Sequence, residues 1–79
     1  MADLIVALDR WVLRTAIQHL ARWGADPQLR HVPLSVNISG RHLAHPHLVD
    51  HVLDPLRAHG VDPTRLTVEV TETESSIEV

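Results

Sequence analysis

Two side chains in this 79-residue sequence have types and positions suited to holding a divalent metal ion. Asn37 lies within VPLSVNIS, residues 32–39, and Glu69 lies within LTVEVTE, residues 66–72. Apolar and polar residues alternate in both segments, as in a β-strand that buries one face, and Asn37 and Glu69 belong to the polar sets. Amide and carboxylate oxygens are hard ligands that Mg²⁺ and Mn²⁺ prefer. The sequence therefore predicts a metal site wherever these two strands lie side by side.

Two amphipathic helices are expected to position the strands. Apolar residues recur at helical spacing over residues 3–23 and over residues 46–59, where Pro55 predicts a kink because it removes a backbone donor. The predicted order is helix, strand, helix, strand, with the strands at 32–39 and 66–72. Because the connection between the strands is long enough for a crossover, the chain is predicted to be α/β with parallel strands. Asn37 and Glu69 would then lie near the carboxyl ends of adjacent strands, where α/β folds place ligands and catalytic groups.

The first helix is predicted to bury one apolar stripe. Its members are Ile5, Leu8, Val12, Ala16 and Leu20, with Leu13 and Ile17 widening it. The opposite, polar face is predicted to carry Asp9, Arg10, Arg14, Gln18 and Arg22.

Alternation has a second interpretation. An antiparallel strand with one face in water shows the same pattern, and Glu69 would then be an ordinary solvated side chain. Spacing alone leaves both interpretations open.

Histidines are the other ligand type that is crowded in the sequence. Four of them, His42, His45, His47 and His51, lie within residues 42–51. His47 and His51 are one helical turn apart, a spacing that can hold Zn²⁺ or Ni²⁺. The alternative, which we favour, is a polar helix face opposite Leu48, Val52 and Leu56.

Composition bounds the class of protein. A chain that is 44% hydrophobic and 22% charged is typical of one small globular domain. A net charge of −3 gives no support for DNA or RNA binding, and the absence of Cys excludes disulfides and thiolate metal sites. No apolar run has the length of about 18 residues that a membrane span needs, so we expect a cytoplasmic location.

Three segments resemble one protein family. The segment VPLSVNISGRHL, followed after a helix by HGVDPTRLTVEVTE, is similar to the middle of an EAL domain, a bacterial signal-transduction phosphodiesterase that hydrolyses cyclic di-GMP. The preceding LIVALDRWVLRTAIQHLARW resembles the family's helix before that strand. The resemblance runs from Leu4 to Glu72, and its specific part is the pair of motifs Asn-x-Ser and Glu-x-Thr-Glu.

The resemblance implies a fold, an activity and roles for three residues. The fold would be a (β/α)8 barrel in which Asn37 and Glu69 coordinate Mg²⁺ or Mn²⁺. Glu72 would steady the loop after a later strand. The intact domain would bind cyclic di-GMP and convert it to the linear dinucleotide pGpG.

Other parts of the family pattern are not found in this sequence. The Glu-Ala-Leu signature, the Asp-Asp-Phe-Gly segment and any lysine are absent, and His42 stands where family members often have Gln. We therefore expect a helix-strand-helix-strand fragment of the barrel that is inactive alone and that self-associates, because both strands would be sheet edges. The alternatives are a non-catalytic module of EAL type that binds cyclic di-GMP or a protein, and a histidine-rich zinc-binding domain.

Overall fold

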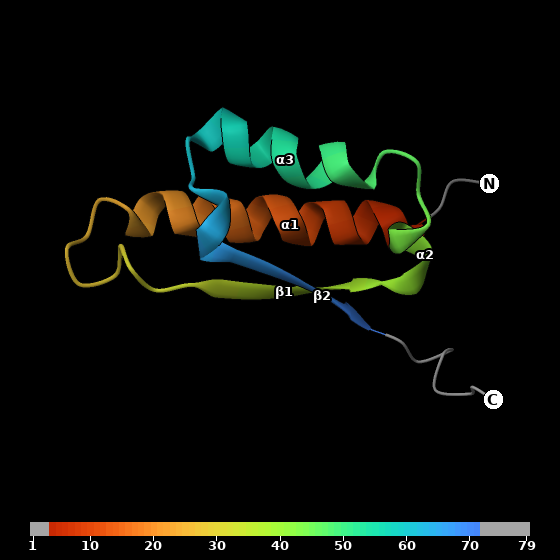
Figure 1. Ribbon diagram of the computed structural model, residues 1–79, viewed down its shortest axis with the longest axis horizontal. Coiled ribbons are helices and arrows are strands. Elements are labelled where there is room, and N and C mark those ends of the chain that lie inside the picture. Colours follow the sequence, from red (N-terminus) through yellow and green to blue (C-terminus); the bar gives the residue numbers. More distant parts are fainter. Residues whose placement is uncertain (1–3, 72–79) are drawn as a thin grey trace.

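The computed structural model of the chain describes residues 4–71, which form a two-stranded sheet with helices on one face (Figure 1). The elements in chain order are α1 (Leu4–Trp23), β1 (Leu34–Ser39), α2 (Gly40–Leu43), α3 (Leu48–His59), the 3-10 turn η1 (Pro63–Arg65) and β2 (Leu66–Thr71). In Figure 1, α1 and α3 both lie above the sheet, and its other face has no helix. None of the helices within residues 4–71 combines the length and the apolar character needed to cross a membrane.

The two strands are parallel, as predicted for an α/β chain. Leu34 is opposite Leu66 at one end of the ladder, and Ser39 is opposite Thr71 at the other. The connection that carries α2 and α3 returns the chain to the end of the sheet at which β1 begins, as a parallel pair requires. The first strand begins at Leu34, later than predicted: the turns after α1 end at residue 31, and Val32 and Pro33 do not join the ladder.

The core lies between the helices and one face of the sheet. One cluster joins α1 to β1 and consists of Leu13, Ala16, Val36 and Ile38. A second cluster joins α1 to the end of α3 and consists of Ile17, Leu20, Leu56 and Val61. Each large apolar side chain that is fully buried contributes about 1.5–3 kcal/mol relative to an exposed one.

The buried face of α1 differs from the predicted stripe. Two predicted members of the stripe, Ile5 and Leu8, are 42% and 60% exposed. Asp9, which was predicted to be on the polar face, is buried beside Leu13. The prediction was wrong here because apolar residues occupy more than half of this helix, so periodicity alone does not decide which of them face the sheet.

The second long helix, α3, begins at Leu48, and its amino-terminal cap is His47. It continues through Pro55 without interruption and ends at His59. Gly60 follows in the left-handed conformation, with φ of 64°, and its N–H donates to the carbonyl of Arg57 at 3.2 Å. That conformation favours glycine and turns the chain toward β2.

One arginine anchors the start of β2 to the loop between α1 and β1. The two terminal nitrogens of Arg65 donate to the carbonyl oxygens of Leu20 at 3.1 Å, and of Leu29 and Val32 at 3.3 Å each. These carbonyls are at the end of α1 and in the connection to β1, so a single side chain fixes the amino-terminal ends of both strands.

Candidate functional site

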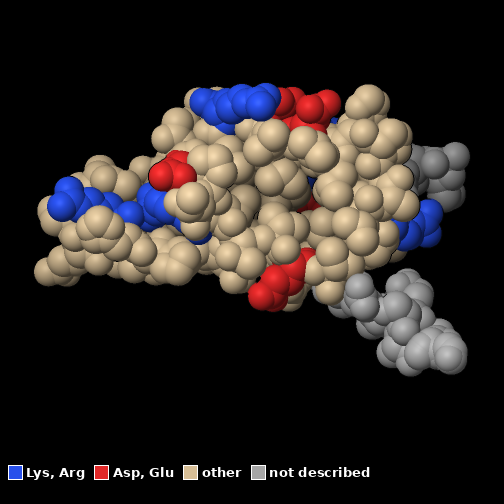
Figure 2. All heavy atoms as spheres, in the orientation of Figure 1, with Lys and Arg blue, Asp and Glu red and all other residues tan. Residues whose placement is uncertain are grey.

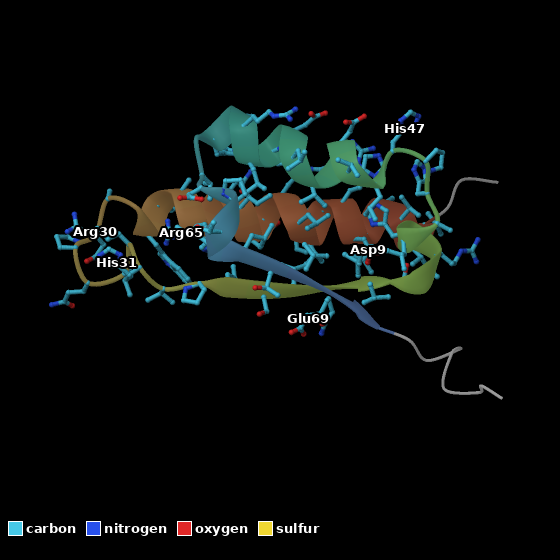
Figure 3. All side chains as sticks on the ribbon, in the orientation of Figure 1. Asp9, Arg30, His31, His47, Arg65 and Glu69 are labelled. Carbon is cyan, nitrogen blue, oxygen red and sulfur yellow. The ribbon has the colours of Figure 1, made fainter. Side chains whose placement is uncertain are left out.

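Asn37 and Glu69 lie next to each other on the face of the sheet that no helix covers. They are paired in the β1–β2 register, and both side chains are exposed. Figure 3 shows Glu69 pointing away from the helices. Neighbouring strands are about 4.8 Å apart, so one ion could contact both side chains.

The local sequence explains why these two polar groups face outward together. Val36 and Ile38 are 5% and 2% exposed in the core, so Asn37 between them must project to the opposite face. Val68 and Val70 pack against the same core and place Glu69 in the same way. The strands are parallel and not antiparallel, but Glu69 is exposed, so its interpretation as a solvated side chain stays open beside the metal-ligand interpretation.

The chemistry of this pair suits a hard cation, but it supplies only two donors. An amide oxygen and a carboxylate are ligand types that Mg²⁺ accepts, together with water and substrate oxygens. Across residues 4–71, no group of three or more His, Asp or Glu side chains is arranged to hold a metal ion. The third residue implied by the resemblance, Glu72, lies outside the described residues.

A buried polar network lies just beyond the carboxyl end of β1. One carboxylate oxygen of Asp9, Oδ2, accepts hydrogen bonds from the backbone N–H of Ser39 at 2.9 Å and from its hydroxyl at 3.1 Å. The Ser39 hydroxyl oxygen in turn accepts the N–H of His42 at 3.3 Å, which caps α2. His42 Nε2 lies 2.8 Å from His51 Nδ1 on α3. The network therefore links α1, β1, α2 and α3.

His42 is the centre of this network, and its side chain is fully buried. Its Nδ1 is 3.3 Å from Asp9 Oδ2, which is within ion-pair distance but does not have the geometry of a hydrogen bond. We therefore describe it as a close contact between the ring and the carboxylate.

The histidines form a cluster of ring contacts instead of one metal site. The His45 and His51 ring centroids are 4.8 Å apart, and those of His42 and His51 are 5.0 Å apart. His51 is partly buried against His42, whereas Asp50 and Asp54, its neighbours on the predicted polar face of α3, are exposed. Since no group of three metal ligands is found within residues 4–71, the zinc hypothesis gains no support.

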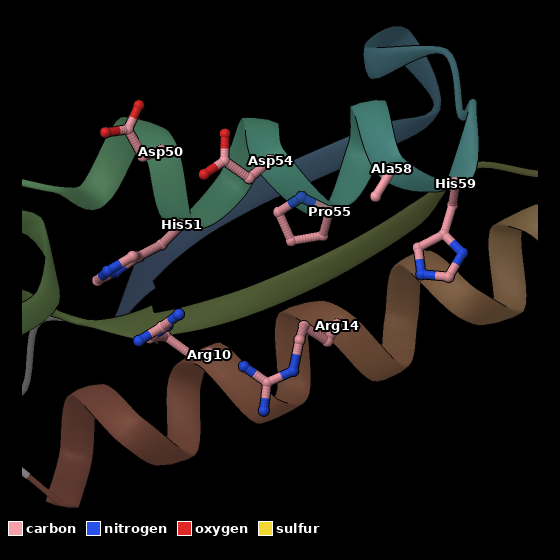
Figure 4. Close-up of a pocket in the computed structure, with 8 residues that line it drawn as sticks. All are labelled: Arg10, Arg14, Asp50, His51, Asp54, Pro55, Ala58 and His59. Atoms are coloured by element: carbon pink, nitrogen blue, oxygen red, sulfur yellow. The ribbon is translucent and has the colours of Figure 1, made fainter.

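The pKa of His51 is lowered, chiefly because burial penalises its charged form. The guanidinium of Arg10 adds to the effect, as do His42, His45 and His47. Arg10 projects from α1 toward His51 across a groove between the two helices (Figure 4). The groove holds about 290 Å³ and is lined by Arg10, Arg14, Asp50, His51, Asp54, Pro55, Ala58 and His59.

Charged side chains are scattered over the surface. On the face that Figure 2 shows, basic and acidic residues lie in several small areas, and at the top of the view the two kinds are side by side. The basic residues do not merge into one patch. This distribution agrees with the small negative net charge of the sequence.

The sequence predicted Asn37 and Glu69 but missed the network around Asp9. The signal that could have indicated this network is Asp9 itself, which lies four residues before Leu13 on the buried face of α1. Ser39 and His42 are about thirty residues from Asp9 along the chain, and no local pattern joins them.

Comparison with known proteins identifies the family of the chain. The family model described as the EAL domain matches residues 1–78. The chain is 42% identical over 66 residues to the oxygen sensor protein DosP of Escherichia coli, covering 82% of this chain and 8% of that protein. It is 38% identical over 69 residues to the bifunctional diguanylate cyclase/cyclic di-GMP phosphodiesterase MucR of Pseudomonas aeruginosa, covering 87% of this chain and 10% of that protein.

A third relative is an uncharacterized protein of Mycobacterium tuberculosis, which is 35% identical over 70 residues. The chain spans 11% of that protein, so it corresponds to about a tenth of each of these relatives. The match to the family model nevertheless includes all of the described residues, with Asn37 and Glu69 among them. The chain belongs to the EAL domain family.

Proposed function

We propose that this chain contributes two metal ligands, Asn37 and Glu69, to a cyclic di-GMP phosphodiesterase domain with a (β/α)8 barrel fold. The observation that carries the proposal is the register of β1 and β2, which pairs Asn37 with Glu69 on the exposed face of the sheet. Membership of the EAL family supplies the substrate class. The reaction would open cyclic di-GMP to pGpG.

The two side chains would hold Mg²⁺ or Mn²⁺ through the amide oxygen of Asn37 and the carboxylate of Glu69. When bound, such an ion polarises the phosphodiester and lowers the pKa of a bound water. The contribution of this chain is to position the two oxygens: the apolar residues on either side of each ligand hold its strand against the helices. Two donors do not complete a two-metal site, so we expect no turnover from the chain alone.

Metal binding at the predicted pair can be tested on the 79-residue chain by NMR. Mn²⁺ broadens the amide signals of nuclei near it, and we expect the loss to centre on Asn37 and Glu69. Glu69→Gln should abolish this broadening, because it removes the charged ligand. Asp54→Asn is the matched control, since Asp54 is an exposed carboxylate on α3, and it should leave the effect unchanged. Broadening centred on the histidines instead would contradict the proposal.

Turnover is tested separately with cyclic di-GMP, Mn²⁺ and chromatographic detection of pGpG. Product from the chain alone that disappears in Glu69→Gln would mean that several copies assemble a working site. Cyclic di-GMP binding without product, from a domain that contains this segment and the remaining ligands, would favour the non-catalytic module over the phosphodiesterase.

A further inference from the structure

The carboxyl end of β1 is held by a carboxylate from another element. Asp9 receives both the backbone N–H and the hydroxyl of Ser39, the last residue of the strand. Ser39 is two residues beyond Asn37, so Asp9 fixes the end of the segment that presents this ligand. Asp9 is itself 8% exposed, and Figure 3 shows it between α1 and the end of the sheet. A buried carboxylate needs such donors, because water cannot replace them.

The pair His42–His51 limits where protons can be placed. Their nitrogens are 2.8 Å apart, so one nitrogen must carry hydrogen and the other must offer a lone pair. With both rings neutral, one arrangement satisfies every contact: His51 Nδ1–H donates to His42 Nε2, and His42 Nδ1–H faces Asp9. The reverse arrangement turns the bare Nδ1 of His42 toward the carboxylate, where the two lone pairs repel.

One added proton leaves this geometry intact. On His51 the proton goes to Nε2, which is not part of the contact. On His42 the proton goes to Nε2 and makes an imidazolium that faces Asp9 and donates to His51, whose own proton must then move from Nδ1 to Nε2. A second added proton puts hydrogen on both contacting nitrogens, and the 2.8 Å contact must then break.

The surroundings add charge on several sides. From α1, Asp9 faces His42, and Arg10 lies across the groove from His51. The connection before α3 brings His45 and His47 close to the His51 ring. On α3 itself, Asp50 lies 3.9 Å from His47 and lines the same groove as His51, as does Asp54. The positive neighbours oppose a second proton on the pair.

We propose that Asp9 is a positioning residue for the metal-binding end of β1, and that the contact between His42 and His51 is a latch that holds this arrangement together. The latch keeps its geometry when the pair takes up one proton, and it opens when the pair takes up a second. The inference rests on the proposed function, because it assigns Asp9 to the strand end that presents Asn37. Acid would thus release α3 from α2. Because the backbone N–H of His42 donates to the Ser39 hydroxyl, the resulting movement of His42 would loosen Ser39 before the core unfolds.

The test is an NMR titration of the isotope-labelled chain from pH 8 to pH 4, without metal or nucleotide. Ring nitrogen shifts report which nitrogens of His42 and His51 carry protons. Amide hydrogen exchange reports the protection factor of Ser39, with Leu20 as the reference for global unfolding. We expect both Nδ1 atoms to carry the proton at pH 8. We also expect Ser39 to lose at least tenfold in protection, with Leu20 unchanged, once both rings are charged.

Two variants separate the latch from general acid effects. His42→Gln removes a titrating ring but keeps a side chain that can donate and accept, so Ser39 protection should stay flat through the same pH range. His47→Gln is the matched control, because that ring is exposed and outside the pair, and it should keep the acid step.

Three results would overturn the latch: unchanged Ser39 protection with both rings protonated, an equal acid step in His42→Gln, or a proton on His42 Nε2 with a bare Nδ1 at pH 8. The last is measured on the unaltered chain, so it stands even where a variant does not fold. Because the titration contains no metal, its failure leaves the Mn²⁺ experiment on Asn37 and Glu69 as an independent decision on the proposed function.

Discussion

At the scale of single residues, this chain places its polar side chains in two ways. Asn37 and Glu69 face outward because each alternates with buried apolar neighbours, which is a local property of its strand. Asp9 is buried where it accepts two hydrogen bonds from the end of β1, and His42 is buried with its Nδ1 3.3 Å from the same carboxylate. The first pair can be predicted from the sequence with the rule of period two. The second cannot, because its hydrogen bonds join residues about thirty positions apart.

Folding stability should decrease as the pH falls from 8 to 5, and His51 should account for part of the decrease. Its pKa is lowered in the folded chain, whereas the unfolded chain has the ordinary value of about 6.5. The unfolded state therefore binds protons more readily, and the stability present above pH 6.5 is lost as the pH falls through the folded pKa. The urea midpoint measured at pH 8 and at pH 5 checks this expectation.

The matched variants for that measurement are His51→Gln and His59→Gln. His51→Gln should lose less stability between the two pH values than the unaltered chain does. His59 is exposed at the end of α3, and its replacement should preserve the full difference. An equal pH dependence in His51→Gln would assign the effect to other groups.

At the scale of elements, α1 is the platform on which β1 rests. Its buried face contributes to both core clusters, and its exposed side keeps several apolar residues in contact with water. Helical periodicity was enough to predict that this element exists and approximately where it ends. The rotation of the helix about its axis was not predictable, because it depends on which side chains meet Val36 and Ile38 of β1.

Two leucines on α1 test this assignment of faces. Leu13 is 0% exposed and packs in the β1 cluster, so Leu13→Ala should lower the free energy of unfolding by about 2–5 kcal/mol. Leu8 is 60% exposed, and Leu8→Ala should change it by less than about 0.5 kcal/mol. Urea denaturation of the unaltered chain and of the two variants measures these changes in the free energy of unfolding. Comparable losses in both variants would mean that the face containing Leu8 is buried as well.

At the scale of the whole molecule, the chain has more open surface than a self-contained domain needs. Within residues 4–71, both strands are edges of a two-stranded sheet, and unpaired edges favour association with other chains. Leu4, Leu8 and Trp11 are 75%, 60% and 57% exposed on one side of α1. An apolar groove of about 420 Å³ lies beside this surface and is lined by Trp11, Val12, Ala16 and residues of β1. The sequence could predict the open edges from the element order, but not the position of this groove.

We expect the isolated 79-residue chain to self-associate through the exposed apolar side of α1 and the groove beside it. Light scattering should give a mass above the 8.8 kDa of one chain, and Trp11→Gln should shift it toward that value. Val49→Gln is the control, because Val49 is 64% exposed on α3, away from the groove. A single-chain mass at all concentrations would contradict the expectation.

The position of Arg65 in the sequence determines when its hydrogen bonds can form during synthesis of the chain. Its side chain binds carbonyl oxygens of residues that precede it by 45, 36 and 33 positions. During synthesis from the amino terminus, α1 and the turns before β1 leave the ribosome well before the residue that fastens them together. The hydrogen bonds that join the end of α1 and the connection before β1 to the start of β2 can therefore form only after Arg65 has been synthesised.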